Sequence, residues 1–405
     1  MAVQPGRARL VRRASILLIG AQVTLWGCLG VWARLAPVQI DELTGRESSA
    51  GLVVAFYYVA AAVGARLTGR IMDRSGRRPG LLLGHAALCV GGLMSFGAIR
   101  AGSSAGLLGA TLVVGFGAAA ALLGRTAMAD LHPPERRGRA VGTLVLTGTA
   151  GAVGGPFLAS ALAGSAGPAA PWLAVAVLGA VGAACAWGLR PDPRDLAVGR
   201  AVTEGHTRPS SVILRTRPGV AAALAIGTSQ AVMATFMAIV PVVLNRAHAG
   251  HGTVSGVVSV HLGAMFLFSP LIGAVLDRAG RRAGLLAGLA ATGLGVGMCS
   301  FPGTTGWAGP GLFLVGVGWS AAYLGSTAMI SDLSTPVERG RALGSIDLLA
   351  SLSAGVGVLG GAALVEGAGM TGLGGVALIL MAAPLALALL LREPAPGRWE
   401  AEPVR

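Results

Sequence analysis

Long apolar runs, separated by short polar segments, recur along the whole chain. A helix needs about 20 mostly apolar residues to cross the hydrocarbon core of a bilayer. The runs therefore predict an all-α membrane protein with twelve transmembrane helices, surrounded by the lipid bilayer. We place these helices at 14–36, 47–70, 80–100, 104–127, 138–163, 169–189, 218–244, 253–275, 283–302, 307–330, 340–364 and 371–391.

The basic residues are divided unequally between the two sides that this arrangement defines. All 31 are arginines, and 25 of them fall at the two termini or in the connections that follow even-numbered spans. Arg66 and Arg125 lie within spans, and the other connections hold only Arg34, Arg46, Arg100 and Arg246. Connections rich in arginine remain in the cytoplasm. We therefore expect a multi-pass protein of the cytoplasmic (inner) membrane with both termini in the cytoplasm.

The composition agrees with lipid as the main surroundings. Hydrophobic residues make up 54% of the chain and charged residues 12%, against about a quarter charged in soluble domains. A net charge of +14 would suit nucleic acid, but the arginines form short clusters between apolar runs, so we expect no nucleic-acid partner. The four cysteines stand singly in different runs. We therefore expect neither a disulfide nor a metal site, and no cofactor.

Two sequence blocks occur twice in the chain. Residues 69–78 read GRIMDRSGRR and residues 273–282 read GAVLDRAGRR, each directly after the second span of a six-span unit. DLHPPERRGRAVG begins at Asp130 and DLSTPVERGRALG begins at Asp332, each after a fourth span. The repeats indicate a duplicated six-helix unit.

The longest polar connection separates the two copies. Residues 190–217 contain Pro191, Pro193 and six arginines, which is typical of a linker. We therefore predict two pseudo-symmetric six-helix bundles, 1–189 and 218–405, with a cytoplasmic linker between them.

The block after each second span resembles the loop signature of the major facilitator superfamily, Gly-x-x-x-Asp-Arg-x-Gly-Arg-Arg. The matching positions are Gly69, Asp73, Arg74, Gly76, Arg77 and Arg78, and again Gly273, Asp277, Arg278, Gly280, Arg281 and Arg282. The resemblance extends over essentially the whole chain. It implies the major facilitator fold, with a transport site between the bundles that opens alternately to the two sides.

Acidic residues next to this signature predict an ionic latch. Asp73, Arg77 and Asp130 can pair at the membrane boundary, where a carboxylate needs an arginine partner. The equivalent set in the second bundle is Asp277, Arg281 and Asp332. The family implies that such latches hold the halves together on the cytoplasmic side while the cavity opens outward. The alternative is a topological anchor and a tight turn without a gating role.

The fifth span contains Gly151, Gly155 and Pro156, which resemble the Gly-x-x-x-Gly-Pro motif of the drug:proton antiporter branch of the family. Glycines four residues apart allow close helix packing, and a proline kinks the helix. The glycine-rich counterpart in the eleventh span has no proline. The resemblance favours efflux over uptake. A general packing face is the alternative, because the chain has 65 glycines.

Ionisable residues inside a span are costly and are therefore candidates for function. Asp347 lies about seven residues into the eleventh span and His261 lies near the middle of the eighth. Either can carry a coupling proton, and the alternative for both is a packing or latch role. We expect Arg125 to pair with Asp130, one turn along the same helix. The first span has no acid before Asp41, which we place beyond its outer end, and this departs from the usual pattern of drug antiporters.

Polar and aromatic side chains in the spans that line the cavity of the family are the substrate-binding candidates. Together with His261 they are Gln22, Trp26, Tyr57, Tyr58, Gln230, Met233, Trp319 and Tyr323. Their polar tips must face protein or water rather than lipid, although each could also be part of the core. The scarcity of charge among them favours a neutral, apolar or weakly cationic small molecule.

Proton-linked efflux of a small amphipathic solute is the function that these features favour. Uptake or facilitated exchange of a small metabolite is the alternative. A membrane enzyme would need a reactive constellation that the sequence lacks, and a non-transporting sensor usually adds a soluble domain. The sequence also lacks a Gly-x-x-x-x-Gly-Lys-[Ser/Thr] loop, so an ion gradient would drive uphill transport. We expect a monomer that interacts with the bilayer, its substrate and protons.

The arginine distribution makes a direct prediction about topology. Single cysteines are introduced into the loops that join spans 2 and 3, spans 6 and 7, and spans 10 and 11 (loops 2–3, 6–7 and 10–11). They should react with an impermeant thiol reagent only from the cytoplasmic side, because the arginines of these loops keep the loops there. Labelling of intact cells and of inside-out vesicles measures this. Reaction of a loop 6–7 cysteine in intact cells would contradict the twelve-helix topology.

Overall fold

Helices account for nearly all of the chain in the computed structural model, which describes residues 5–46, 48–132, 134–196, 208–301, 306–334 and 339–391. The first half contains α1 (Pro5–Thr44), α2 (Ser48–Ser75), α3 (Arg77–Arg100), α4 (Ser104–Leu122), α5 (Gly124–Asp130), α6 (Pro134–Ala166) and α7 (Ala170–Trp187). The short α8 (Ser210–Leu214) precedes the second half. That half contains α9 (Arg217–Arg246), α10 (His251–Leu267), α11 (Ser269–Ala279), α12 (Arg281–Ser300), α13 (Ala308–Asp332) and α14 (Arg339–Leu390).

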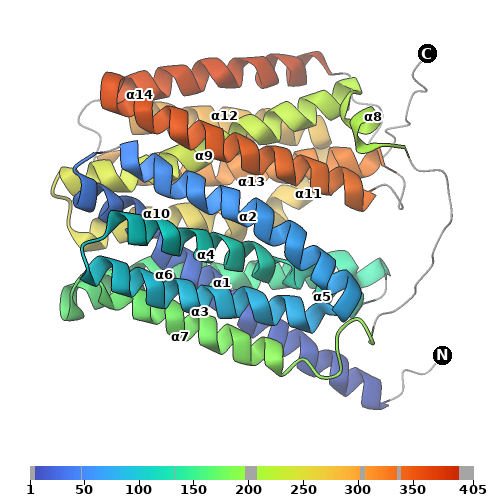
Figure 1. Ribbon diagram of the computed structural model, residues 1–405. Coiled ribbons are helices and arrows are strands. Elements are labelled where there is room, and N and C mark those ends of the chain that lie inside the picture. The colour runs from blue at the N-terminus through green and yellow to red at the C-terminus, as the bar shows by residue number, and fades with distance from the viewer. Residues whose placement is uncertain are drawn as a thin grey trace.

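The predicted membrane-spanning architecture is confirmed. Within the described residues, 11 helical stretches are long and apolar enough to cross a membrane. The last stretch holds the two final predicted spans, because α14 reverses direction at Gly369, where φ is 66° and the helix is interrupted (Figure 1). Breaks at Leu123 and Phe268 divide the fourth span into α4 and α5 and the eighth into α10 and α11.

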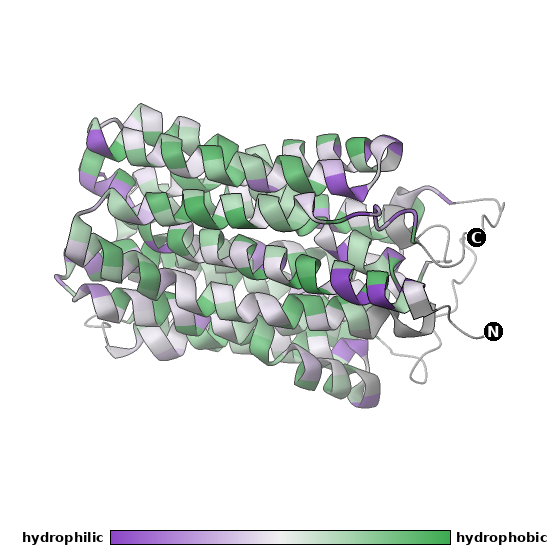
Figure 2. Ribbon diagram, turned by 90° about the horizontal axis from the view of Figure 1, so that it is seen from below, coloured by the Kyte–Doolittle hydropathy of each residue, from purple (hydrophilic) through white to green (hydrophobic). Residues whose placement is uncertain are grey.

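The helices form an elongated bundle with polar ends. α1 begins and α14 ends at the same end of the bundle, where α5 also ends, and we call this the arginine-rich end (Figure 1). Figure 2 shows apolar residues along the sides of the helices and hydrophilic residues concentrated at the ends. Large apolar side chains such as Val177, Leu294 and Ile379 are exposed on the sides, as expected of surfaces that face lipid.

The first helix is longer than the sequence predicts. We expected it at 14–36, with Arg34 and Asp41 near or beyond its outer end, but α1 continues to Thr44. Arg34 and Asp41 are therefore helical, and they are 2% and 4% exposed. Hydropathy ends a span where charges begin, but these charges are shielded from lipid by the second half of the protein, which supplies their partners.

The duplicated signature forms the same turn in both halves. Gly76 and Gly280 have φ angles of 95° and 90°, a region that glycine adopts without strain. Next to each turn an arginine reaches the last helix of its own half. Arg78 Nε donates to the Trp187 carbonyl at 3.1 Å, and Arg282 Nε donates to the Ala388 carbonyl at 3.0 Å. The arginines satisfy carbonyls that a helix C-terminus leaves unpaired.

Glycine strips allow two pairs of helices to approach closely. A Cβ atom on Gly151 or Gly155 of α6 would collide with the backbone of α1. In the second half, a Cβ on Gly357 or Gly361 of α14 would collide with α9. The two strips occupy equivalent places in the repeat. The predicted motif in the fifth span is therefore a packing surface against the first span, and the eleventh span, the first part of α14, keeps that surface without the proline.

These contacts predict a position-dependent effect of added volume. Gly151→Val should lower the free energy of unfolding by about 1–3 kcal/mol, the usual cost of overpacking, because the valine side chain would overlap the α1 backbone. Gly154→Val is the matched control, since Gly154 is exposed on the same helix with nothing within 4 Å of its Cβ position. Thermal unfolding in detergent measures both variants. Equal stability of the two would contradict this packing.

Candidate functional site

Two arginine–aspartate pairs form at equivalent places near the arginine-rich end. Arg77 Nε lies 2.7 Å from Asp130 Oδ2, and Arg281 Nε lies 2.9 Å from Asp332 Oδ2. The first pair joins α3 to α5 and the second joins α12 to α13, so each stays within one half. The side chains of Asp73 and Asp277, which we also assigned to the latch, lie outside the described residues.

Asp192 adds a contact that the sequence analysis missed. Its carboxylate accepts hydrogen bonds from the backbone N–H groups of Arg77 at 3.0 Å and Arg78 at 2.9 Å. A carboxylate at a helix N-terminus is favourable because the N–H groups there lack helical partners. Asp192 follows α7 and caps α3 from more than a hundred residues away along the chain. The linker is thereby attached to the signature turn of the first half.

A charged pair that joins the two halves differs from our prediction. We expected Arg125 to pair with Asp130, but its Nη2 lies 3.3 Å from Asp347 Oδ2, on α14 of the other half. Residues five apart on a helix point about 140° away from each other, so α5 directs Asp130 toward α3 and Arg125 toward α14. The Tyr323 hydroxyl lies 3.4 Å from the other carboxylate oxygen of Asp347. The Asp347 side chain is 36% exposed, although it lies inside a span.

A polar and aromatic cluster lies deeper between the halves. Gln230 Nε2 donates to the Tyr58 hydroxyl at 3.2 Å, which joins α9 to α2. Trp319 Nε1 donates to Gln230 Oε1 at 2.5 Å, and the Trp319 ring stacks on Tyr323 with centroids 5.1 Å apart. Tyr57 meets Tyr58 edge-on at 5.3 Å. Five of the predicted substrate-binding residues thus form one group, which we call the Gln230 cluster. Tyr323 connects this cluster to Asp347.

No hydrogen bond or ring contact links the remaining candidates to this cluster within the described part of the chain. Trp26 packs against Phe266 of the other half at 4.5 Å between ring centroids, and Gln22 and Met233 are buried. His261 is fully buried, with Nδ1 2.8 Å from the Leu312 carbonyl of its own half. Its Nε2 has no partner among the described residues. His261 therefore has no contact with Asp347, and the two coupling candidates occupy separate places.

Polar contacts also join the halves at the end opposite the arginine-rich end. Arg246 Nε of α9 lies 3.0 Å from Asp41 Oδ2 of α1, and Asn245 Nδ2 lies 3.1 Å from Glu42 Oε1. Sequence reasoning missed both pairs, because it placed Asp41 in a loop. An aspartate that is 4% exposed needs such a partner, since burying an unpaired charge is costly.

Serine hydroxyl groups connect α6 and α10 near the same end. Ser255 donates to the Pro156 carbonyl at 2.9 Å and Ser259 donates to the Val153 carbonyl at 2.8 Å. Ser160 of α6 also contacts the Ser255 hydroxyl. Ser255 and Ser259 are four residues apart and hence on one helix face, and this spacing is the signal that could have revealed the interface. These bonds attach α10 to the backbone of α6 at Val153 and Pro156.

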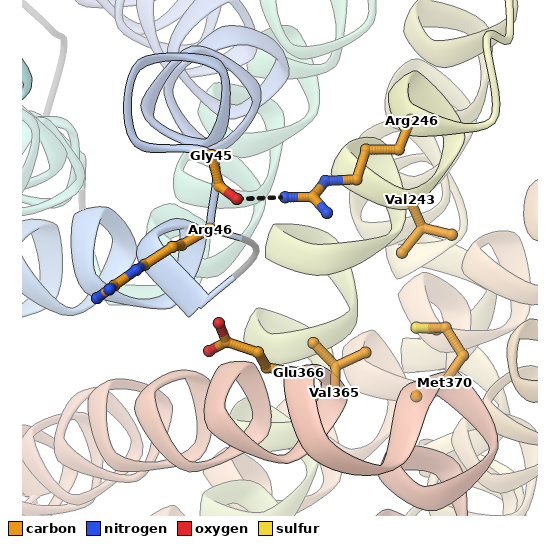
Figure 3. Close-up of a pocket in the computed structure, with 8 residues that line it drawn as sticks. Gly45, Arg46, Val243, Arg246, Val365, Glu366 and Met370 are labelled. Atoms are coloured by element: carbon orange, nitrogen blue, oxygen red, sulfur yellow. Dashed lines mark hydrogen bonds between the residues drawn. The ribbon is translucent and has the colours of Figure 1, made fainter.

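A pocket of about 370 Å³ lies beside the Asp41–Arg246 pair. Figure 3 shows Arg246 reaching the Gly45 carbonyl, while Glu366 rises from α14 on the other side of the pocket. Val243, Val365 and other residues of α9 and α14 complete the lining. The pocket lies between the end of α1 and the second half of the protein, so it is outside the Gln230 cluster.

Comparison with known proteins agrees with this architecture. The family model described as Major Facilitator Superfamily matches residues 17–245 and 222–405. The chain belongs to the Major Facilitator Superfamily. It is 32% identical over 412 residues to YdeG of Bacillus subtilis (strain 168), an uncharacterized MFS-type transporter, with 94% of this chain and 91% of that protein covered. YddS of the same strain, also an uncharacterized MFS-type transporter, is 30% identical over 375 residues, covering 86% and 84%.

A third relative has a named substrate. The riboflavin transporter RfnT of Brucella anthropi (strain ATCC 49188) is 25% identical over 364 residues, covering 84% of this chain and 86% of that protein. Two solved structures share the fold. The human organic anion transporter MFSD10 has a TM-score of 0.66 at 17% identity, covering 95% of this chain and all of that one. The nucleoside transporter NupG has a TM-score of 0.67 at 16% identity, covering 94% and 97%. This member of the Major Facilitator Superfamily is thus a transporter rather than an enzyme.

The contact between α6 and α10 can be tested by cross-linking. In a variant whose four native cysteines are replaced by alanine, Ser160→Cys with Ser255→Cys should form a disulfide in more than about half of the molecules after mild oxidation, because the two hydroxyl groups touch. Mass spectrometry of the digested protein measures the yield. The matched control is Ser165→Cys with Ser255→Cys, since Ser165 is exposed more than one turn away. Equal yields from both pairs would contradict the interface.

Proposed function

We propose that this transporter moves a small, neutral or amphipathic solute by alternating access, as a single chain and in exchange for protons, in the direction of efflux. The substrate site lies between the halves, at the cluster formed by Tyr58, Gln230, Trp319 and Tyr323. Access alternates when the contacts at one end of the bundle break and those at the other end form. We propose further that the arginine-rich end faces the cytoplasm and that the membrane is the cytoplasmic one, in accord with the positive-inside rule.

The observation that carries the proposal is the place of Asp347. It lies within a span, bonds across the two halves to Arg125 and is still 36% exposed. A carboxylate in this setting has two competing partners, the guanidinium of the other half and a proton. Proton uptake removes the charge that holds Arg125 and therefore weakens a contact between the halves. Protonation and the arrangement of the halves are then linked, and coupled transport requires such a link.

The contacts at the opposite end support one conformation for this structure. Asp41, Glu42 and Ser255 each hold a residue of the other half, and α10 packs against α6 there. Toward the arginine-rich end, α11 packs on α12 and α13 within its own half. We propose that this is the inward-facing state, closed to the outside. The exposure of Asp347 then comes from an opening on the cytoplasmic side.

The Gln230 cluster supports a planar aromatic substrate. Its side chains supply an amide, a phenol and an indole N–H next to the stacked rings of Trp319 and Tyr323. Aromatic faces bind flat rings, and the amide selects for hydrogen-bonding edges. No carboxylate other than Asp347 hydrogen-bonds to this cluster within the described part of the chain. A neutral or weakly cationic compound therefore fits better than a dicarboxylate or a phosphate.

Uptake is the second candidate direction. The relative RfnT is a riboflavin transporter, and riboflavin is a small metabolite, the substrate class that this alternative assumes. Its planar ring with hydrogen-bonding edges also fits the Gln230 cluster. Efflux remains our first proposal, because Gly151, Gly155 and Pro156 match the antiporter motif and because Asp347 provides a proton site. Transport of labelled aromatic compounds into inside-out vesicles, compared with right-side-out vesicles, measures the direction.

Coupling through Asp347 gives a specific expectation. Asp347→Asn should reduce accumulation driven by a proton gradient at least about tenfold while leaving energy-independent exchange within about twofold, because the amide cannot alternate between charged and neutral states. Proteoliposomes with and without an imposed gradient measure both activities for a substrate found in the vesicle screen. Glu366→Gln is the matched control, because Glu366 is an exposed carboxylate at the far end of the same spanning helix.

The two candidate coupling residues can be separated in the same assay. Gradient-driven accumulation that survives in Asp347→Asn but disappears in His261→Ala would assign the proton to His261 instead. Survival in the double variant would contradict proton coupling through either residue and would favour a facilitator. Loss of exchange together with accumulation would show that Asp347 also binds substrate.

A further inference from the structure

Arg34 is a buried cation whose hydrogen bonds are incomplete. It lies in α1 and is 2% exposed. Nε donates to the Ser255 hydroxyl at 3.2 Å, and Nη2 lies 3.4 Å from His251 Nδ1. Nη1 has no hydrogen-bond partner among the described residues. A guanidinium offers five donors, and a buried donor without an acceptor is costly.

The surroundings of Arg34 provide no compensating negative charge. No carboxylate of the described chain lies within 4 Å of its guanidinium. Glu42, eight residues further along α1, is exposed and accepts a hydrogen bond from Asn245. Arginine is nevertheless charged at any physiological pH. The structure therefore holds an unbalanced charge between the halves.

The element that faces Arg34 adds positive potential. His251 and Ser255 belong to the first five residues of α10, which has 17 residues. The N-terminus of a helix carries a partial positive charge and favours anions. A cation placed against this end is in the unfavourable orientation unless a negative group lies between them. Arg34 and the start of α10 thus converge on one place from the two halves.

The neighbouring polar groups cannot supply that negative group. The Ser255 hydroxyl has a single proton, which it donates to the Pro156 carbonyl, so it can only accept from Arg34. A guanidinium has only donors, so His251 Nδ1 can only accept in its contact with Arg34. Ser160 donates to the His251 carbonyl at 3.1 Å. None of these groups carries a negative charge.

We propose that Arg34, together with the N-terminus of α10, binds a small monovalent anion, either a halide or the carboxylate of a small solute. The anion accepts a hydrogen bond from Nη1. Its negative charge offsets the positive charge of Arg34 on α1 and the partial positive charge at the N-terminus of α10. His251, Gly252 and Thr253 are exposed at the end opposite the arginine-rich end, whereas Nη1 is buried, so the anion enters from that end when the side chains around Arg34 move aside. Because the bound anion contacts both halves, it stabilises the state in which this end is closed.

Anion binding can be measured without transport, so the test does not depend on the proposed function. Purified protein in detergent is titrated with sodium chloride that replaces sodium isethionate at constant ionic strength, and the midpoint of thermal unfolding is recorded. The expected result is a saturable rise in the midpoint, because an anion that binds only the folded protein stabilises it. The apparent affinity should fall at least about tenfold in Arg34→Gln.

Arg46→Gln is the matched control, because Arg46 is an exposed arginine at the same end of the bundle. It should keep the chloride response of the unmodified protein. The proposal would be overturned if the unmodified protein showed no saturable response to chloride, acetate or benzoate. It would also be overturned if Arg34→Gln responded as strongly as the unmodified protein. A response to acetate or benzoate but not to chloride would support the site and identify a solute carboxylate as its ligand.

A second measurement does not depend on the folding of a variant. Crystals of the unmodified protein grown with sodium bromide should show an anomalous peak within hydrogen-bonding distance of Arg34 Nη1. If benzoate but not chloride stabilises the protein, a brominated benzoate replaces bromide in this experiment. The ligand concentration in the crystals must exceed the measured dissociation constant. Under that condition, the absence of an anomalous peak at Arg34 would overturn the proposal.

Discussion

The cost of placing charge in lipid explains where four charged residues in the helices of this transporter lie. A single charged residue at the centre of a spanning helix costs about 2.5–3.5 kcal/mol on insertion scales, and no water is present there to compensate. Arg34, Asp41, Arg125 and Asp347 therefore turn away from lipid, toward the contact between the two halves. The same requirement that makes them costly places them at the contact between the halves, which the proposed alternating access would separate.

Close helix packing makes these charged contacts possible. The glycine strip around Gly151 brings α6 against α1, and the strip around Gly357 brings α14 against α9. One pair of helices in each half is consequently held in close contact. The arginines of the signature turn strengthen this, because Arg78 and Arg282 attach the last helix of each half. Two firm halves can then exchange a small number of polar contacts at either end without losing their own structure.

Much of the fold could be predicted from the sequence, because lipid imposes a length and a hydrophobicity on each span. The repeat and the arginine distribution then indicated two equivalent halves. The partners of individual charges were not predictable in the same way. Arg125 and Asp130 are close in sequence but point to different helices. Hydropathy places Arg34 and Asp41 at the end of a span, because it does not show that another part of the protein shields a charge from lipid. Such errors arise wherever a partner comes from the other half of the chain.

The candidate site was predictable by residue type but not by arrangement. Gln230, Trp319 and Tyr323 were selected because polar and aromatic side chains avoid lipid, and they do form one cluster. His261 met the same criterion, yet it is bonded within its own half. The capping role of Asp192 could not be predicted, because it depends on where the linker lies in space after the whole first bundle has folded. Sequence spacing carries no information about that position.

The most direct test of this account measures movement at both ends of the same molecule. Spin labels are attached at Ser75 and Ala279, at the arginine-rich end, and in a second variant at Ala101 and Ala247, at the opposite end; all four residues are exposed. Double electron–electron resonance reports the two distances with and without substrate, at neutral and acidic pH. The account predicts that one distance shortens as the other lengthens. Two distances that stay constant, or that change in the same direction, would contradict alternating access.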